Sequence, residues 1–199
     1  DINNMKKNRP TIGMVIDRIL GVAGYQSALW EGVQQAIRHY NCNLVVFAGG
    51  ALQMLENSPY EFQRNEIYNL ISDNQLDALL ISMATLGHVT EPERVEEFYA
   101  KSKGIPQINI GFEIYGNLPG VTIDNYQGVY EAVLHLIQEH GCQRIAFIQG
   151  PMVNKEAQLR HAGYIDALAA ADLPFDQGMV VPGNFYRESG RQGMKTLLN

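Results

Sequence analysis

The sequence predicts an α/β fold in which helices flank parallel sheets. Short apolar runs rich in Val and Ile recur along the chain, segments with helical periodicity separate them, and the two kinds of segment alternate in strict order. Parallel strands need crossover connections of this kind, and such connections are right-handed in nearly all known sheets.

Seven short apolar runs are the predicted strands. They show little polar alternation, which is typical of strands that are buried on both faces of a sheet. In chain order the runs are 11–16, 44–47, 78–81, 107–110, 121–123, 145–148 and 179–181.

Three helices are predicted in the first half of the chain. Between Tyr25 and Tyr40 the apolar residues fall at steps of three and four, which gives one apolar face that packs on a sheet. The next two helices begin with capping patterns, Ser58-Pro59-Tyr60-Glu61 and Thr90-Glu91-Pro92-Glu93. In such patterns a hydroxyl and a carboxylate satisfy free N–H groups of the first turn.

Two further helices are predicted in the second half. Asp124-Asn125 can cap the first of them, which ends at Gly141, a residue type suited to a left-handed C-cap. The second spans 155–171.

In open parallel sheets, ligands bind beyond the carboxyl ends of the strands. The residues that follow the predicted strands are therefore the candidates for a binding site. They are Asp17, Gly49-Gly50, Ser82-Met83, Gly111-Phe112, Asp124, Gln149-Gly150-Pro151 and Asn184-Phe185.

Composition narrows the classes of partner. The 199 residues, 46% of them hydrophobic, suffice for one large domain or two small lobes. With 15 Lys+Arg against 21 Asp+Glu the formal charge is -6, so these residues should repel nucleic acid and anionic membranes. Cys42 and Cys142 are expected to be reduced and structural. No apolar run reaches the length needed to span a membrane, and residues 1–10 are polar, so a cytoplasmic location is expected. Residues 1–10 are expected to be a tail or a cloning remnant.

Motifs for catalysis do not fit. Gly21-Val22-Ala23-Gly24 lies between a strand and a helix, but its spacing is one residue wider than the GxGxxG of dinucleotide sites. The chain has no GxxxxGK[ST] and no GxSxG, and its five histidines are dispersed. We therefore expect no catalytic residue, no metal site and no cofactor.

From Val121 onward the order of residue types becomes specific. Four segments together fix the residue types at about a dozen spacings. They are Val121-Thr-Ile-Asp124-Asn125-Tyr-Gln-Gly128, the run 140–151, Arg160-His-Ala-Gly163-Tyr164 and Gly183-Asn-Phe185. This pattern resembles the effector-binding domain of the LacI/GalR family. The first half resembles it more loosely, in 11–16, 29–33 and 76–81.

The resemblance implies a two-lobed fold of the type I periplasmic-binding-protein kind. The N-terminal lobe is expected at 11–142 and the C-terminal lobe at 143–199, with the second lobe incomplete, so that the chain is a fragment. The implied function is a ligand-sensing domain of a transcription regulator that binds a small polar metabolite, such as a sugar or nucleoside, between its lobes. The implied partners are a second copy of the chain and, through a headpiece outside these residues, DNA.

Two alternatives remain open. The loops at 21–26 and 47–50 depart from the usual family pattern and are similar to those of sensor modules ahead of histidine kinase or diguanylate cyclase domains. A solute-binding transport protein of the same fold is the other alternative.

The resemblance also implies binding residues. Arg160 matches an arginine that holds ligand hydroxyls or carboxylates with forked donors, although an ion pair with Glu156 is the alternative. Phe185 matches an aromatic ring placed against a sugar face.

The other candidates rest on position. Asp17 and Tyr25 flank the first strand-to-helix turn. There the Asp17 carboxylate could accept hydroxyls of a ligand, and the Tyr25 ring could stack on it. The alternative is that each residue only caps or packs the helix. Asp124 is expected chiefly to cap its helix. Gly49, Met83 and Phe112 are chosen because they follow predicted strands.

Overall fold

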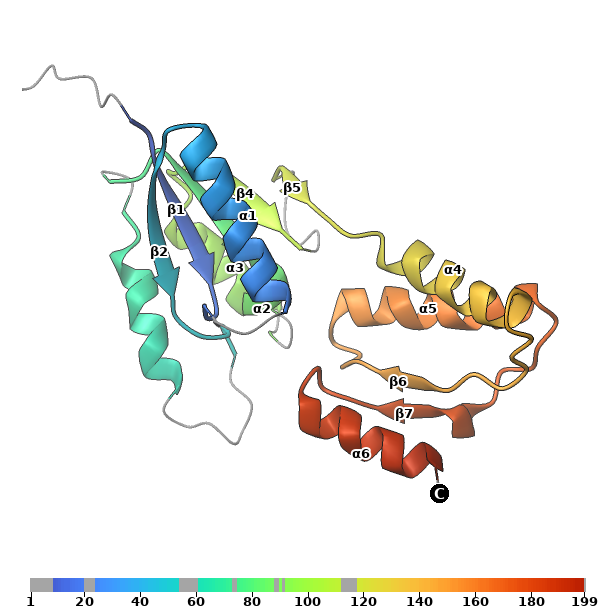
Figure 1. Cartoon of the computed structure of the whole chain (residues 1–199). Helices are drawn as coiled ribbons and strands as arrows, with labels where there is room; N and C mark the ends of the chain where they lie inside the picture. Colours follow the sequence, from blue (N-terminus) through green and yellow to red (C-terminus); the bar gives the residue numbers. More distant parts are fainter. Residues whose placement is uncertain are drawn as a thin grey trace, which may run out of the picture. The chain divides into compact units, whose positions relative to one another are not determined.

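The computed structural model describes residues 9–19, 24–53, 61–72, 75–87, 90, 92–111 and 118–198. The chain divides into two compact units, Asp1–Thr122 and Ile123–Asn199. Both contain parallel strands flanked by helices (Figure 1), so the predicted fold class is confirmed.

The first unit contains a five-stranded parallel sheet with the strand order β2-β1-β3-β4-β5. Its strands are β1 (Thr11–Ile16), β2 (Asn43–Ala48), β3 (Ala78–Ser82), β4 (Gln107–Ile110) and β5 (Gly120–Val121). The predicted runs coincide with these strands to within a residue or two. Strand β5 is the shortest and begins one residue earlier than predicted.

Helices cover both faces of this sheet (Figure 1). Helix α1 (Tyr25–His39) packs on the face that carries Met14 and Ile16, with Val33 as its buried residue. Because side chains alternate along a strand, Val15 points to the opposite face. There it packs in a core with residues of the 3₁₀ helix η2 (Glu61–Leu70), the short helix α2 (Met83–Leu86) and α3 (Pro92–Lys101).

Helix η2 differs from its prediction. An α-helix was expected from the capping pattern 58–61, of which residues 58–60 lie outside the described part of the chain. The described part is a 3₁₀ helix. Over ten residues an apolar pattern does not separate a repeat of 3.0 from one of 3.6.

The second unit is built on a parallel pair of strands, β6 (Phe147–Gln149) and β7 (Val180–Pro182). Helix α5 (Lys155–Ala170) packs on the face of Phe147 and Val180, and α4 (Asn125–Gln138) packs against α5. A one-turn helix, η3 (Gln177–Met179), precedes β7, and α6 (Arg187–Leu198) approaches Ile148 and Val181 on the other face.

The division of the chain after Thr122 differs from the expected lobe boundary at 142. The reason is that α4 buries its apolar side chains, including Val133, against α5. Helix α4 therefore belongs to the second unit.

Helices α4 and α5 begin where they were predicted, whereas α4 ends at Gln138, before the predicted end at Gly141. Oδ1 of Asp124 accepts a hydrogen bond from the Gln127 N–H at 2.9 Å, and Oδ1 of Asn154 accepts one from the Ala157 N–H at 2.8 Å. Gly141 follows α4 with a φ of 64°, the left-handed conformation in which glycine is unstrained. Within the described residues, no helix combines the length and the apolar character needed to cross a membrane.

Candidate functional site

Arg160 lies on α5 with its guanidinium group fixed from two sides. Its Nε donates to Oδ1 of Asn125, the first residue of α4, at 2.7 Å. Its Nη2 lies 3.3 Å from Oε2 of Glu156, one turn earlier on α5. Both partners are buried, whereas the Arg160 side chain is 34% exposed. These contacts use two of the five N–H donors of a planar group, so Arg160 is oriented and can still donate to a ligand.

Phe185 lies beside Arg160 with a half-exposed ring. The Arg160 Cζ is 5.8 Å from the ring centroid, within the range of a cation–π contact. A Cβ at Gly150 would lie 2.6 Å from the Phe185 ring, so the absence of a side chain at Gly150 makes room for it. The backbone of Phe185 has a φ of 66°, which is strained for a bulky residue, and strained residues cluster at ligand-binding and active sites.

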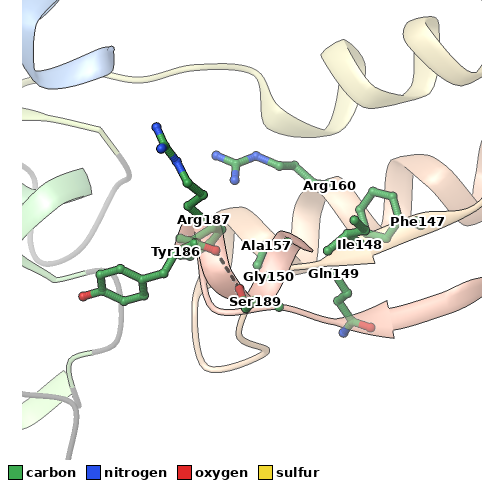
Figure 2. A pocket seen from close by; sticks show the side chains of 12 residues that line it. Phe147, Ile148, Gln149, Gly150, Ala157, Arg160, Tyr186, Arg187 and Ser189 are labelled. Carbon is green, nitrogen blue, oxygen red and sulfur yellow. Dashed lines mark hydrogen bonds between the residues drawn. The ribbon is translucent and has the colours of Figure 1, made fainter. Parts of the chain in front are cut away.

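These residues line a cavity of about 370 Å³ in the second unit. Its walls come from β6, the residue after β6, the first half of α5, the segment after β7 and the start of α6. Figure 2 shows that the guanidinium groups of Arg160 and Arg187 extend to the same side of the strands, whereas the amide of Gln149 points to the opposite side. The chemistry of the Arg160 side is thus cationic and aromatic.

Buried aromatic rings support the cavity from behind. Phe147, which lines it, stacks on Tyr164 with 4.8 Å between centroids and an interplanar angle of 13°. Tyr164 is almost fully buried and donates its hydroxyl to the Ile145 carbonyl at 2.8 Å. Burial raises the pKa of Tyr164 above its ordinary value. The stacked ring and this hydrogen bond tie α5 to the chain just before β6.

In the first unit, Asp17 follows β1 and is 3% exposed. Its Oδ2 accepts from Nε of Arg18 at 3.1 Å, and its backbone N–H donates to Oγ1 of Thr85 at 3.4 Å. Its Oδ1 is buried and has no hydrogen-bond partner among the residues that the structure describes. Because an unsatisfied buried oxygen is costly, Asp17 is a candidate to accept a hydrogen bond from a ligand.

Gly49 has a packing role that the sequence did not reveal. A side chain there would overlap the ring of Tyr68 from η2. The Tyr68 hydroxyl accepts from the Gly50 N–H at 3.0 Å and donates to the Gly50 carbonyl at 2.8 Å. Burial raises the pKa of Tyr68 far above its ordinary range. Tyr68 therefore fixes the loop after β2 as a neutral group.

The remaining candidates are described within their own units. Met83 is fully buried in the core of the first unit, and Tyr25, the first residue of α1, is 42% exposed. Asp124 lies next to Asn125, is exposed, and caps α4. Phe112 lies outside the described residues.

Sequence reasoning missed Asn125 and Arg187. The Asp124-Asn125 pair was interpreted only as a helix cap, although Asn125 holds Arg160 from 35 positions away. Arg187 lies two residues after Phe185, and this closeness to a candidate binding residue is the sequence signal that could have pointed to it. Among the described residues, no three His, Cys, Asp or Glu side chains gather where they could hold a metal ion.

Comparison with known proteins gives concordant matches. The family model for periplasmic binding proteins and the sugar-binding domain of the LacI family matches residues 9–199. Catabolite control protein A of Streptococcus mutans is 27% identical over 195 residues, which are 97% of this chain and 53% of that protein. The HTH-type transcriptional repressor PurR of Photorhabdus laumondii is 28% identical over 156 residues, which are 77% of this chain and 44% of that protein.

A solved structure agrees with these matches. The complex of the transcriptional regulator CelR with cellobiose superposes with a TM-score of 0.72 at 27% identity, covering 96% of this chain and 56% of that one. The chain thus spans about half the length of the relatives that it matches.

Proposed function

This chain belongs to the family of periplasmic binding proteins and LacI-family sugar-binding domains, and on that premise we propose that it is the ligand-sensing domain of a transcription regulator. It binds a small polar metabolite such as a sugar. The observation that carries the proposal is the guanidinium of Arg160, held by Asn125 and Glu156 beside the half-exposed ring of Phe185.

The arrangement suits a polar ligand with an apolar face. Arg160 is positioned before the ligand arrives, so little side-chain entropy is lost on binding. The ring of Phe185 offers a flat apolar surface on which a sugar ring can stack, while the fork of Arg160 donates to oxygens at the edge of the ligand. A few placed polar groups in a concave, largely apolar pocket are the usual composition of a small-molecule site.

Contacts outside this cavity are part of the proposal. Asp17, with its unsatisfied Oδ1, is proposed to accept a hydroxyl of the ligand, and Tyr25 to offer an exposed ring in the same unit. The other three candidates are proposed to act structurally. Gly49 leaves room for Tyr68, Met83 packs in the core of the first unit, and Asp124 caps α4.

The relatives support the regulatory role. Catabolite control protein A and PurR are regulators by name, and the CelR structure contains cellobiose. We propose that the whole protein regulates transcription as a homodimer, binds DNA through a separate segment, and catalyses no reaction. The ligand shifts the protein between states only to the extent that it binds one state more tightly.

The experiment is a binding screen with a matched pair of variants. Neutral sugars and nucleosides are tested against the 199-residue chain by thermal shift, and hits are measured by calorimetry. A ligand at a hundredfold its Kd stabilises the fold by about 2.7 kcal/mol, which is readily detected.

Arg160→Lys is the diagnostic variant. Lysine keeps a positive charge near the buried Glu156, so the fold should survive, but it cannot donate in the planar fork. We expect affinity to fall about tenfold or more, whereas Arg144→Lys, at an exposed position in the same unit, should bind as the unchanged protein does. Equal affinity in the Arg160→Lys protein would remove Arg160 from the site.

A further inference from the structure

We infer that the cavity of the second unit selects ligands that carry an anionic group, a carboxylate or a phosphate ester, and that Arg187 recognises this group. The inference rests on the proposed function and deepens it by naming the chemical class of the ligand. Its basis is the balance of charges and of hydrogen-bond donors around the cavity.

The charge of the cavity is not balanced. Its lining includes two arginines, Arg160 and Arg187, and no Asp or Glu. The charge of Arg160 is offset by Glu156 behind it, at 3.3 Å. Arg187 has no ion pair or hydrogen bond in the described part of the chain. The unopposed charge in the cavity is therefore that of Arg187.

The acidic residue next to Arg187 does not supply the missing charge. The carboxylate of Glu188 accepts from Nε of Arg191 at 2.9 Å, one turn further along α6. Glu188 and Arg191 form an ion pair, and this hydrogen bond lowers the pKa of Glu188. Glu188 thus leaves Arg187 available.

Arg187 also lies where a cation is unfavourable for the fold. It is the first residue of the twelve-residue helix α6, whose free N–H groups already make this end positive. Most exposed arginines are simply solvated, and this is the alternative for Arg187. Its place in the cavity wall, on the same side as Arg160 (Figure 2), argues for a role in binding.

The side chains on this side of the cavity donate and do not accept. The hydroxyl of Ser189 accepts from the Asn184 N–H at 3.0 Å and donates to the Tyr186 carbonyl at 2.9 Å, so it is occupied. The amide of Gln149 points to the opposite side (Figure 2). Tyr186 also lines the cavity, but its hydroxyl extends away from the guanidinium groups (Figure 2). The polar side-chain groups on the Arg160 side are therefore the two guanidinium groups, which are donors only.

This donor set distinguishes between ligand classes. A neutral sugar presents hydroxyls that both donate and accept, and their protons would find no side-chain acceptor here. A carboxylate or phosphate group accepts only, and it makes short, charge-assisted bonds with guanidinium groups. The anionic class therefore matches the cavity.

The test uses three probes at constant ionic strength, set with sodium chloride: inorganic phosphate, D-gluconate and D-glucose. Binding to the 199-residue chain is measured by calorimetry and located by amide chemical shifts at Gly150 and Gly190. We expect phosphate and gluconate to bind at these positions, and the tighter of the two shows which anion the cavity prefers.

Arg187→Gln and Lys195→Gln form a matched pair on α6. We expect Arg187→Gln to weaken phosphate and gluconate binding at least about tenfold. Lys195→Gln should leave both unchanged, because Lys195 is an exposed cation of the same helix that does not line the cavity and its removal leaves the Glu188–Arg191 pair intact. Equal binding of the anions by the Arg187→Gln protein would overturn the inference.

The failure of the inference is separable from that of the proposed function. If neither anion binds while a neutral sugar binds in a manner that depends on Arg160, the anionic preference is wrong and the sensing function stands. If no anion, sugar or nucleoside binds, both are wrong.

Discussion

Substitution of Gly163 by alanine tests how closely α4 and α5 approach each other. A Cβ at Gly163 would lie 2.5 Å from the carbonyl oxygen of Tyr126 and 3.2 Å from the backbone N of Tyr130, both on α4. Ordinary contacts of a Cβ begin at 3.4 Å. Because both close atoms belong to the backbone, no side chain can turn aside, and the two helices must separate.

The expected cost is the difference between two terms. Forcing an extra methyl group into a packed interface costs about 1–3 kcal/mol. Replacing glycine inside a helix by alanine gains about 1 kcal/mol in helix propensity. Because both close atoms belong to the backbone, we expect the steric term to lie in the upper part of its range, at about 2–3 kcal/mol. Gly163→Ala should then lower the free energy of unfolding by about 1–2 kcal/mol, which corresponds to a fall in Tm of about 4–16 °C for a unit of this size.

The assay is urea and thermal denaturation followed by far-UV circular dichroism, with amide hydrogen exchange in α4 and α5 as a local readout. Gly128, on α4, is the control, since a Cβ there meets nothing within 4 Å. Gly128→Ala should therefore gain up to about 1 kcal/mol from propensity alone. The comparison separates steric overlap from the general effect of replacing a helical glycine.

The same substitution should affect binding. Arg160 on α5 bonds Asn125 on α4 at 2.7 Å, so separating the helices stretches the contact that orients the guanidinium. Ligand affinity should fall in Gly163→Ala and stay unchanged in Gly128→Ala. A Gly163→Ala protein as stable as the unchanged chain, with normal exchange in α5, would refute the close approach of the helices.

Three further substitutions test the cap, the buried phenol and the strained aromatic residue. Asn154→Ala removes the side-chain acceptor of the Ala157 N–H. It should lower the free energy of unfolding by about 1 kcal/mol and speed amide exchange in the first turn of α5. Unchanged amide exchange there would show that the cap is not needed. Burial raises the pKa of Tyr68 above its ordinary value of 10.0, so the folded chain keeps this proton at a pH where the unfolded chain releases it. The free energy of unfolding in urea should therefore be maintained up to about pH 10 and decline above it. The Tyr68→Phe protein should be less stable at neutral pH, but its stability should decline less steeply above about pH 10. If the stability of the two proteins fell in parallel with pH, this assignment would be contradicted. Phe185→Gly relieves a φ of 66° and should leave the free energy of unfolding within about 1 kcal/mol while abolishing sugar binding, so retained affinity would exclude the ring from the site.

Local patterns were sufficient for much of the fold. The Val- and Ile-rich runs predicted the strands of the described residues, and Asp124 caps the helix that follows it, as expected. Such features depend on neighbours within a few residues, which a single sequence contains in full. The resemblance carried by 121–185 likewise pointed to Arg160 and Phe185, which the structure brings to one cavity.

The partners of those residues could not be predicted in this way. Nothing local shows that Asn125 orients Arg160, that α4 groups with α5 in the second unit, or that Tyr68 fills the space above Gly49. Periodicity also did not separate the 3₁₀ helix η2 from an α-helix.

The sequence by itself determined that this chain is an α/β protein of parallel strands and which family it resembles, because apolar periodicity and the order of residue types are local properties. Only the tertiary structure decided which side chains surround the cavity and which charges there are balanced. Contacts between residues far apart along the chain depend on how helices and strands pack, and packing is settled by the fit of all the side chains together.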